Sequence, residues 1–329
     1  MMKKDFPKWI VVWCSVLLLT GCEFFALTFA PEKESRENTT KLAKHAHTVF
    51  WKTLHGGEYQ NIPEAMTLLK AAYLENPHDA KVAAHIGFLH IWRLSERRRL
   101  ETIPSQITDD AVLARKYFGE AVRLNPNDAR FLGFYSSLLM TEGSIHNDEY
   151  LTRKGYYQGL DSIDAWPQFN LFTIGYTMSR NDYTNPRFAE ALEMQWRNIE
   201  VCLDDDIDRE NPDVARYFPR EAAETRALYK RACWNSEIAP YNVQGFFMNL
   251  GDMLVKNGEV AVAKRIYQTA KQHPDFKTWP YKDVLNRRIR HAEKNVERFR
   301  HIIDNSEKVT EDAIMILTPF SCMACHEKG

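Results

Sequence analysis

A pattern of small and larger apolar residues followed by proline occurs three times in the chain and restricts its fold more than any other feature. Each copy has an alanine, a larger residue four positions on, a second alanine three positions later and then a proline: Ala65, Leu69, Ala72 and Pro77; Ala114, Phe118, Ala121 and Pro126; Ala263, Tyr267, Ala270 and Pro274. Residues three and four apart share a helix face, and proline disfavours helix in the residue before it. The pattern therefore predicts closely packed helices that end near the prolines.

These positions resemble the tetratricopeptide repeat (TPR) family. Before the third copy stands a matching first-helix half, made of Phe247, Leu250, Gly251 and Leu254. Gly87 stands where the family has its first-helix glycine, and the resemblance covers residues 60–142 and 242–275. It implies an all-α fold in which helical hairpins stack as a TPR-like solenoid over residues 39–280.

The repeat is interrupted between the well-matched parts. The first two copies lie 49 residues apart, so a period of about 34 residues carries an insertion of about 15, which we assign to residues 96–110. Residues 146–236 look helical but contain tryptophan and proline where the pattern breaks, and we predict divergent repeats there. By analogy with the fold, such an array presents a concave surface to a protein or peptide partner.

A stripe of apolar residues follows the array at alternating spacings of four and three. Its members are Leu285, Ile289, Ala292, Val296, Phe299 and Ile303. This spacing predicts one amphipathic helix within residues 281–304 that caps the last repeat. Its other face is basic, and we interpret that face as solvated.

The N-terminus has the pattern of an export signal, with three lysines before the apolar run at residues 9–19. Leu19-Thr20-Gly21-Cys22 resembles the bacterial lipobox, whose cysteine is lipidated. The resemblance implies a signal peptide at residues 1–22, a lipid on Cys22 and a tether at residues 23–38. Glu23 in the second mature position favours the periplasmic side of the outer membrane.

Two other interpretations of the N-terminus remain open. Residues 9–30 are long enough for one uncleaved membrane helix, although Glu23 near its middle makes that insertion costly. Alternatively, Thr28-Phe29-Ala30 is an ordinary cleavage site. All three interpretations place the body of the chain outside the cytoplasm.

Six cysteines divide into groups by position. Cys14 lies within the signal, Cys22 is the lipid site, and two more belong to the C-terminal motif. Cys202 and Cys233 are left as an even pair in an oxidising compartment, and we predict a disulfide between them, with two buried thiols as the alternative.

The C-terminal segment, residues 305–329, contains Cys322-Met323-Ala324-Cys325-His326, which matches the C-x-x-C-H signature of c-type haem attachment. The resemblance implies one covalent haem c, with thioethers at Cys322 and Cys325 and His326 as the proximal iron ligand. A redox thiol pair would need a thioredoxin-like βαβ fold, and a zinc site would need two further ligands. The sequence shows neither.

Only three residues follow His326, so residues upstream or another molecule must shield the haem. We expect the apolar residues just before the motif to pack on its ring: Ile314, Met315, Ile316, Leu317 and Phe320. A sixth iron ligand must also come from a distance. Its candidates are His45, His47, His85, His90, His273, His291, His301, Met253 and Met315.

The sequence favours an exported, membrane-anchored monohaem electron carrier whose array docks a redox partner. The alternative is a TPR scaffold or assembly factor in which the haem is structural, regulatory or absent. A net charge of −1 gives no reason to expect nucleic acid. Asp204, Asp206 and Asp208 alternate as in an EF-hand, but the required glycine and glutamate are missing. No nucleophile triad or phosphate loop is present, which favours a carrier or binding protein over an enzyme.

Overall fold

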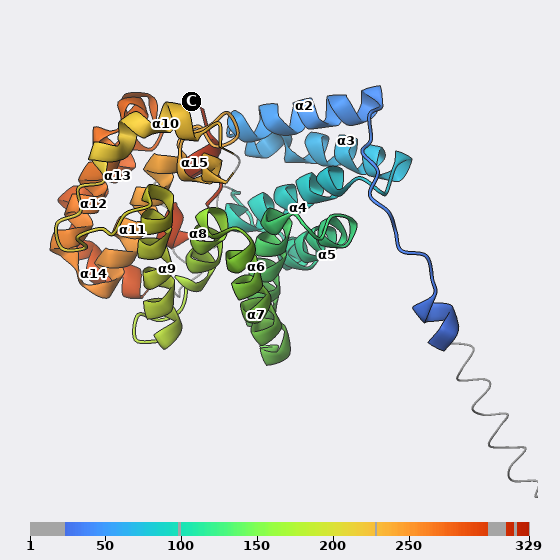
Figure 1. The fold of residues 1–329 in the computed structure, drawn as a ribbon, viewed down its shortest axis with the longest axis horizontal. Helices are drawn as coiled ribbons and strands as arrows, with labels where there is room; N and C mark the ends of the chain where they lie inside the picture. The colour runs from blue at the N-terminus through green and yellow to red at the C-terminus, as the bar shows by residue number, and fades with distance from the viewer. Residues whose placement is uncertain (1–23, 98–99, 228, 302–313, 319–320, 329) are drawn as a thin grey trace, which may run out of the picture. The chain divides into compact units, whose positions relative to one another are not determined.

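The computed structural model describes residues 24–97, 100–227, 229–301, 314–318 and 321–328. The chain divides into two units, residues 1–34 and 35–329. In the first unit, residues 24–28 are helical and residues 24–30 are exposed. The predicted signal peptide and Cys22 lie outside the described residues. The helices considered below all belong to the second unit (Figure 1).

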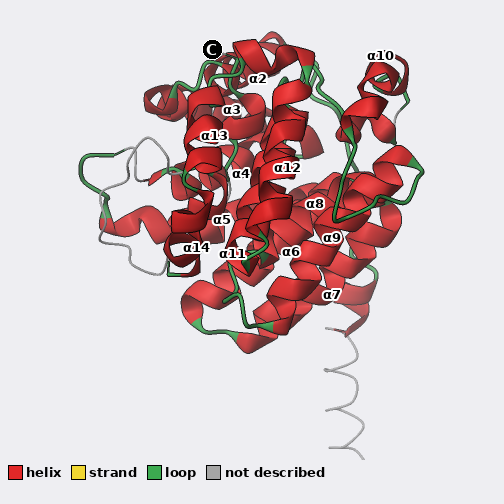
Figure 2. Cartoon of the chain, turned by 90° about the vertical axis from the view of Figure 1, so that its left-hand side faces the viewer, coloured by secondary structure: helices red, strands yellow, loops and turns green. Residues whose placement is uncertain are grey.

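Every regular element in the described part of the chain is helical, as the all-α prediction expected (Figure 2). The long helices are α2 (Lys41–His55), α3 (Ile62–Glu75), α4 (Ala80–Ser95), α5 (Asp109–Leu124), α6 (Ala129–His146), α7 (Glu149–Ala165), α8 (Pro167–Met178), α9 (Pro186–Leu203), α11 (Asn242–Asn257) and α12 (Val260–Gln272). The shorter ones are α10 (Glu221–Glu224), α13 (Lys282–Arg290), α14 (Ala292–Arg300) and α15 (Met323–His326). Single 3-10 turns are η1 (Tyr59–Asn61), η3 (Ser105–Thr108), η4 (Ala215–Arg220), η5 (Lys230–Cys233), η6 (Pro274–Thr278) and η7 (Met315–Leu317). None of the described helices is both long and apolar enough to cross a membrane.

Neighbouring helices pack in pairs along the chain: α2 on α3, α4 on α5, α6 on α7, α8 on α9 and α11 on α12. The predicted prolines lie just after α3 and α5, and an aspartate then begins the next helix. The Asp79 carboxylate accepts hydrogen bonds from the N–H groups of Lys81 and Val82 at the start of α4. The Asp128 carboxylate likewise accepts a hydrogen bond from the N–H group of Arg130 at the start of α6. These caps satisfy N–H groups that have no partner within their own helix.

The predicted close approach of paired helices is confirmed at two glycines. A Cβ on Gly87 of α4 would lie 2.6 Å from Cδ2 of Phe118 on α5. A Cβ on Gly251 of α11 would lie 2.2 Å from Cε1 of Tyr267 on α12. Both aromatic side chains are completely buried. Each pair is therefore held at a distance that only glycine permits.

The chain between α9 and α11 differs from the prediction of divergent helical repeats. Residues 204–241 contain only η4, α10 and η5, joined by irregular backbone. Two prolines and an acidic loop occupy the stretch where helix was expected. Asp208 there accepts hydrogen bonds from the N–H groups of Glu210 and Asn211, so this one of the EF-hand-like aspartates stabilises a turn. No group of three metal-binding side chains occurs among the described residues.

The predicted single amphipathic helix at residues 281–304 is instead two helices, α13 and α14. The backbone leaves helical geometry at His291, with φ −112° and ψ 17°. The bend lets Leu285 before it and Phe299 after it both bury completely in one core. The basic face is not entirely solvated, because Arg288 is 2% exposed, with its Nε 3.4 Å from a carboxylate oxygen of the buried Asp252 on α11.

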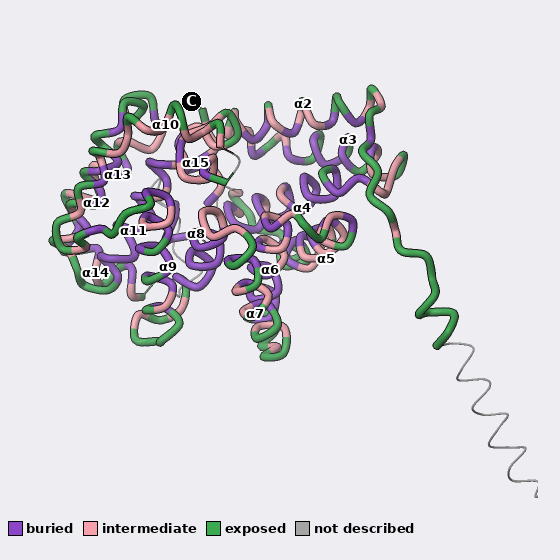
Figure 3. The backbone as a smooth tube through the Cα atoms, viewed as in Figure 1, coloured by how far each residue is buried: buried purple, intermediate pink, exposed green. Residues whose placement is uncertain are grey.

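The described part of the C-terminal segment packs into the helical body (Figure 3). The side chains of residues 314–318 are buried, and η7 packs on α11. The short helix α15 lies against α11 on one side and α2 on the other (Figure 1). Segments more than 200 residues apart in the sequence therefore meet at the cysteine motif.

Candidate functional site

The cysteine motif forms one turn of helix, with Cys322 as the N-terminal cap of α15. Residues three and four apart lie on the same helix face, so Cys322, Cys325 and His326 point to one side. All three line a single cavity. The two residues between the cysteines face the other way: Met323 is buried against α2, α3 and α4, and Ala324 joins the core around α11.

Hydrogen bonds from four distant segments fix the backbone of the motif. The indole Nε1–H of Trp279 donates to the carbonyl of Ala324 (2.8 Å), and the Tyr241 N–H donates to the carbonyl of Cys325 (3.0 Å). At the other end, the Met323 N–H donates to the buried carboxylate of Glu96 (3.4 Å). The carbonyl of His55 accepts from the N–H of Lys328 (2.8 Å). The turn is therefore held from both of its ends.

Tyr176 of α8 holds the chain that leads into the motif. Its Oη lies 2.8 Å from the carbonyl of Met315 and 3.0 Å from that of Thr318, and it accepts a hydrogen bond from the N–H of Ser321 (3.0 Å). Burial raises the pKa of Tyr176 well above its ordinary value. The phenol therefore stays protonated and able to donate at neutral pH.

Gly245 of α11 allows the motif to pack against that helix. A Cβ at this position would lie 2.3 Å from Sγ of Cys325 and 3.3 Å from the backbone of Ala324. Heavy atoms at 2.3 Å overlap, so any other residue would push the turn away from α11. The sulfur of Cys325 occupies the space that a side chain would take.

The three motif residues line a partly open cavity, which has a volume of about 180 Å³ for a water-sized probe. We call it the motif cavity. Its aromatic lining comes from α6, α8, α11 and the chain around Trp166 and Trp234: Phe134, Trp166, Phe169, Phe172, Tyr176, Trp234 and Phe246. Most of its surface is therefore apolar.

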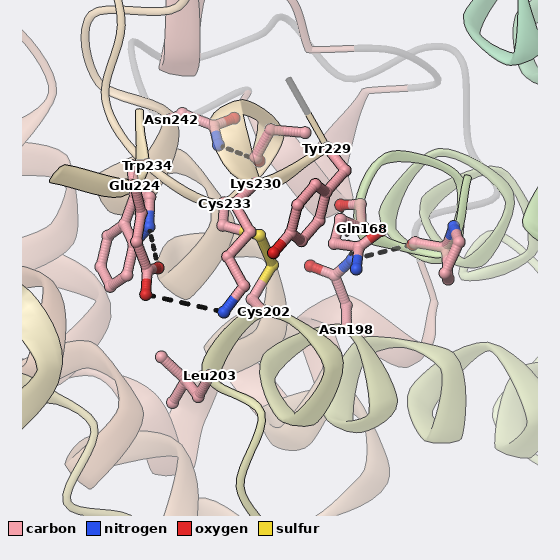
Figure 4. The surroundings of a disulfide bond; sticks show 12 residues. Gln168, Asn198, Cys202, Leu203, Glu224, Tyr229, Lys230, Cys233, Trp234 and Asn242 are labelled. Carbon is pink, nitrogen blue, oxygen red and sulfur yellow. Dashed lines mark hydrogen bonds and ion pairs between the residues drawn. A yellow bond between two sulfur atoms is a disulfide. The ribbon is translucent and has the colours of Figure 1, made fainter. Parts of the chain in front are cut away.

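One wall of the motif cavity is irregular backbone. Residues 230–239, here called the wall segment, contribute Arg231, Trp234, Ile238 and three small residues to the lining. A disulfide between Cys202 and Cys233 joins α9 to the wall segment, with a Cα–Cα distance of 5.5 Å. Figure 4 shows the bridge beside Trp234, whose indole donates to Glu224 (2.8 Å).

Further contacts fix the wall segment on both sides of the bridge (Figure 4). The carbonyl of Ala232 accepts from the amide of Asn242 (2.8 Å). Lys230 is buried beside the carboxylates of Glu224 (3.6 Å) and Asp204. Irregular backbone usually lies on the surface and is mobile, but here a covalent bond and an ion cluster hold it in place.

The wall segment also fixes which ring nitrogen of His326 carries the hydrogen. The imidazole Nδ1 lies 2.7 Å from the carbonyl oxygen of Ile238. A carbonyl only accepts, so Nδ1 carries the hydrogen. Burial lowers the pKa of His326 to about 4, so the ring is neutral at pH 7 and its Nε2 has a free lone pair. A neutral imidazole held in this way is the form that binds metals.

His55 of α2 approaches the same carbonyl from another helix. Its Nε2 lies 3.2 Å from the oxygen of Ile238, so two imidazoles share one acceptor. Burial lowers the pKa of His55. His55 does not line the motif cavity. It therefore lies behind His326, on the side of the hydrogen-bonded Nδ1.

The two motif cysteines are not joined by a disulfide. Burial raises the pKa of Cys325 to about 12, so its thiol stays protonated at neutral pH. A thiol that exchanges disulfides needs a lowered pKa. The environment of Cys325 therefore disfavours a redox thiol pair.

No family model matches the sequence, and no curated protein or solved structure is detectably similar to it.

The predicted sixth-ligand candidates lie elsewhere in the molecule. His326 is the one histidine that lines the motif cavity, and no methionine lines it. His90 is held by Asp110 (2.6 Å), and His273 contacts Gln244 and Glu221. His85 stacks on Phe50 at 4.0 Å between ring centroids. Met253 and Met315 are completely buried in the core, and His45, His291 and His301 are exposed.

The apolar residues just before the motif were expected to pack on the haem ring, but they lie elsewhere. Residues 314–317 pack in the core with α11, α13 and α14 and do not line the motif cavity. Phe320 lies outside the described residues. The aromatic side chains of α6, α8 and α11 and of the wall segment line the cavity instead.

Sequence reasoning missed Tyr176, Ile238, Gly245 and Trp279, because each meets the motif only through the fold. One signal was present. Trp166 and Trp234, two of the tryptophans that break the repeat pattern, both line the motif cavity.

Proposed function

We propose that the chain is an exported monohaem protein related in chemistry to c-type cytochromes. One haem c is bound through thioethers to Cys322 and Cys325, with His326 as its proximal iron ligand. The observation that supports this best is the shared cavity: both sulfurs and the neutral imidazole line one apolar space. The haem supplies reversible one-electron chemistry, so we propose electron transfer as the function.

The donor set of the motif cavity fits a haem. Thioether formation needs two thiols that are not in a disulfide, and neither Cys322 nor Cys325 is in one. Axial binding needs an unprotonated ring nitrogen, and the hydrogen bond from Nδ1 to Ile238 leaves Nε2 in that state. A porphyrin is a flat apolar ring, and seven aromatic side chains line the cavity.

Two arginines line the part of the motif cavity where the propionate groups of a haem could bind. Arg130, Trp166 and Arg231 line both the motif cavity and an adjoining pocket on the surface. Arg130 is paired with Asp128 (2.6 Å). Across the described chain, no carboxylate pairs with Arg231. Haem propionates are carboxylates, which arginine binds with paired hydrogen bonds. We propose that Arg231 holds a propionate at this edge.

We also propose that the paired helices form a TPR-like array that docks a redox partner. The succession of hairpins and the glycine contacts at Gly87 and Gly251 support that arrangement. The alternative, a TPR scaffold or assembly factor that binds proteins or peptides, rests on the same hairpins. It does not account for three haem-binding residues, Cys322, Cys325 and His326, lining one cavity.

The proposed place of the protein is the bacterial envelope. The lysine-rich start, the apolar run and the lipobox-like Leu19-Thr20-Gly21-Cys22 support export and a lipid anchor on Cys22. A disulfide between Cys202 and Cys233 agrees with an oxidising compartment outside the cytoplasm. The outer membrane, on its periplasmic side, is the location we propose.

The proposal is tested by haem content. The chain is produced with its own signal in bacteria competent for cytochrome maturation, and the membrane-purified protein is examined by intact mass and by haem staining of a denaturing gel. We expect the added mass of one haem and one lipid. Cys322→Ala and Cys325→Ala should each weaken covalent attachment, and the double variant should lose it completely.

Met323→Leu is the matched control, because it changes a residue of the same turn that faces the core and conserves volume. It should keep a full complement of haem. Wild-type protein that matures in its native envelope without the added mass would contradict the haem proposal and leave the scaffold alternative.

A further inference from the structure

Among the described residues, His326 is the one histidine that lines the motif cavity, and no methionine lines it. Besides the motif residues, the lining consists of aromatic, aliphatic, amide, hydroxyl and arginine side chains. Histidine and methionine are the side chains that usually take the second axial position in cytochromes c.

The residues outside the described ranges do not offer the missing ligand either. Residues 98–99, 228, 302–313, 319–320 and 329 include no histidine and no methionine. Within residues 1–23 the two methionines are Met1 and Met2, which precede the proposed cleavage site. In the mature protein, every histidine and every remaining methionine is therefore a described residue.

The nearest other histidine is held away from the cavity. His55 shares the Ile238 carbonyl with His326, and that oxygen lies on the Nδ1 side of the His326 ring. An iron bound at Nε2 lies on the other side of the same ring. His55 therefore supports the proximal ligand and does not face the opposite side of the haem.

Three polar groups of the lining are engaged with the protein, whereas the hydroxyl of Ser321 has no hydrogen-bond partner in the described part of the chain. The amide of Asn198 donates to the carbonyl of Gln168 (2.9 Å), and that of Asn242 donates to Ala232. The hydroxyl of Thr173 donates to Phe169 (3.1 Å). Among the residues that the structure describes, no carboxylate lines the cavity.

We propose that this chain leaves the sixth coordination position of its haem open to a small neutral diatomic ligand. The inference rests on the proposed haem attachment and extends it from electron transfer to ligand binding. An apolar lining favours a neutral ligand over an anion, because burying an unpaired charge is costly. The aromatic side chains shape the space in which the ligand sits.

Carbon monoxide is the probe, and the test uses the full-length, membrane-purified protein. Haem staining and the pyridine haemochrome spectrum first establish attachment. We expect the ferric protein to have a high-spin spectrum and the reduced protein to shift its whole main absorption band on carbon monoxide addition. The shift should saturate at one ligand per haem.

The outcomes separate the two proposals. The protein could carry covalent haem and still have low-spin spectra in both oxidation states that saturating carbon monoxide does not change. This result would overturn the open sixth position and leave the haem proposal intact. Absence of covalent haem would overturn both.

His55→Gln provides the matched control, since the glutamine amide can still donate to Ile238. We expect the variant to keep the wild-type spin state and carbon monoxide shift. A low-spin wild type that becomes high-spin in His55→Gln would identify His55 as the sixth ligand and contradict the proposal.

Discussion

Gly245 shows how one missing side chain positions the reactive sulfur. In Gly245→Ala the new Cβ would overlap Sγ of Cys325, which lies 2.3 Å away, so the motif turn must move off α11. We expect a loss of about 1–3 kcal/mol in the free energy of unfolding, typical of overpacking. The displaced thiol should also lower covalent haem content, measured by haem staining against total protein.

Gly119→Ala on α5 is the comparison. Its Cβ would meet the partly exposed ring of Tyr135 at 3.0 Å, and alanine favours helix over glycine by about 1 kcal/mol. The haem content of this variant should be unchanged, and its free energy of unfolding should be nearly that of the wild type. If Gly245→Ala behaves like Gly119→Ala, the motif does not need this close contact.

His85 makes stability depend on pH. It is buried on α4, with its Nδ1 2.9 Å from Nδ1 of His47 on α2, and burial lowers its pKa well below 6.5. The unfolded chain then binds a proton more readily than the folded one. Stability is therefore fully present above pH 6.5 and falls as the pH decreases below that value.

In His85→Phe this contribution disappears. The wild type should lose unfolding free energy between pH 7 and pH 5. We expect this loss to be about 1–2 kcal/mol smaller in the variant, because one proton contributes at most about 1.4 kcal/mol per pH unit. Denaturant unfolding at the two pH values measures it. His45→Gln on α2, where the ring is exposed, should show the wild-type dependence; an equal change in both variants would contradict the assignment.

At the level of elements, the sequence predicted the helical pairs but not the motif turn or the wall of the site. Spacings of three and four define a helix face wherever the helix is, so α3, α5 and α12 could be inferred. Ile238 lies 88 residues from His326, and Tyr176 lies 145 residues from Ser321, the residue just before the motif. No local periodicity connects residues so far apart.

The break between α13 and α14 was missed for a related reason. The apolar stripe continues through His291 at helical spacing, so the sequence gives no sign that the axis changes there. On the two sides of the break, Arg288 forms a buried pair with Asp252 and Phe299 packs in the core. Those are tertiary contacts, and an amphipathic pattern cannot report them.

The disulfide should stabilise the molecule chiefly through the wall segment. The cysteines are separated by 31 residues, and closing a loop of that length contributes about 3–4 kcal/mol on a chain-entropy model. Cys202→Ala with Cys233→Ala should lose about that much in denaturant unfolding. Hydrogen exchange should increase most in residues 230–239, because the remaining contacts there are single hydrogen bonds and the Lys230 cluster.

Covalent haem should still form in the double variant, because the motif backbone is fixed by Trp279, Tyr241 and Glu96. Reduction of the wild-type protein is the control and should reproduce the effect. If exchange increases equally across α2–α7, the bridge stabilises the whole molecule, and a local role for it is wrong.

For the molecule as a whole, the C-terminal segment belongs to the core. Five large apolar side chains of this segment, Ile314, Met315, Ile316, Leu317 and Met323, are at most 8% exposed. Burying one such side chain contributes about 1.5–3 kcal/mol, and a typical domain has a total stability of about 5–15 kcal/mol. Removing residues 314–329 should therefore abolish the cooperative unfolding transition, followed by circular dichroism on heating.

The control is deletion of residues 24–34, which retains Cys22 and the export signal. Residues 24–30 are exposed and belong to the other unit of the chain, so the melting temperature should be unchanged. A truncated chain that still melts cooperatively would mean that the motif is an appendage on an independent helical array. A cooperative loss would mean that the array and the proposed haem site fold as one body, so the site depends on helices from α2 to α14.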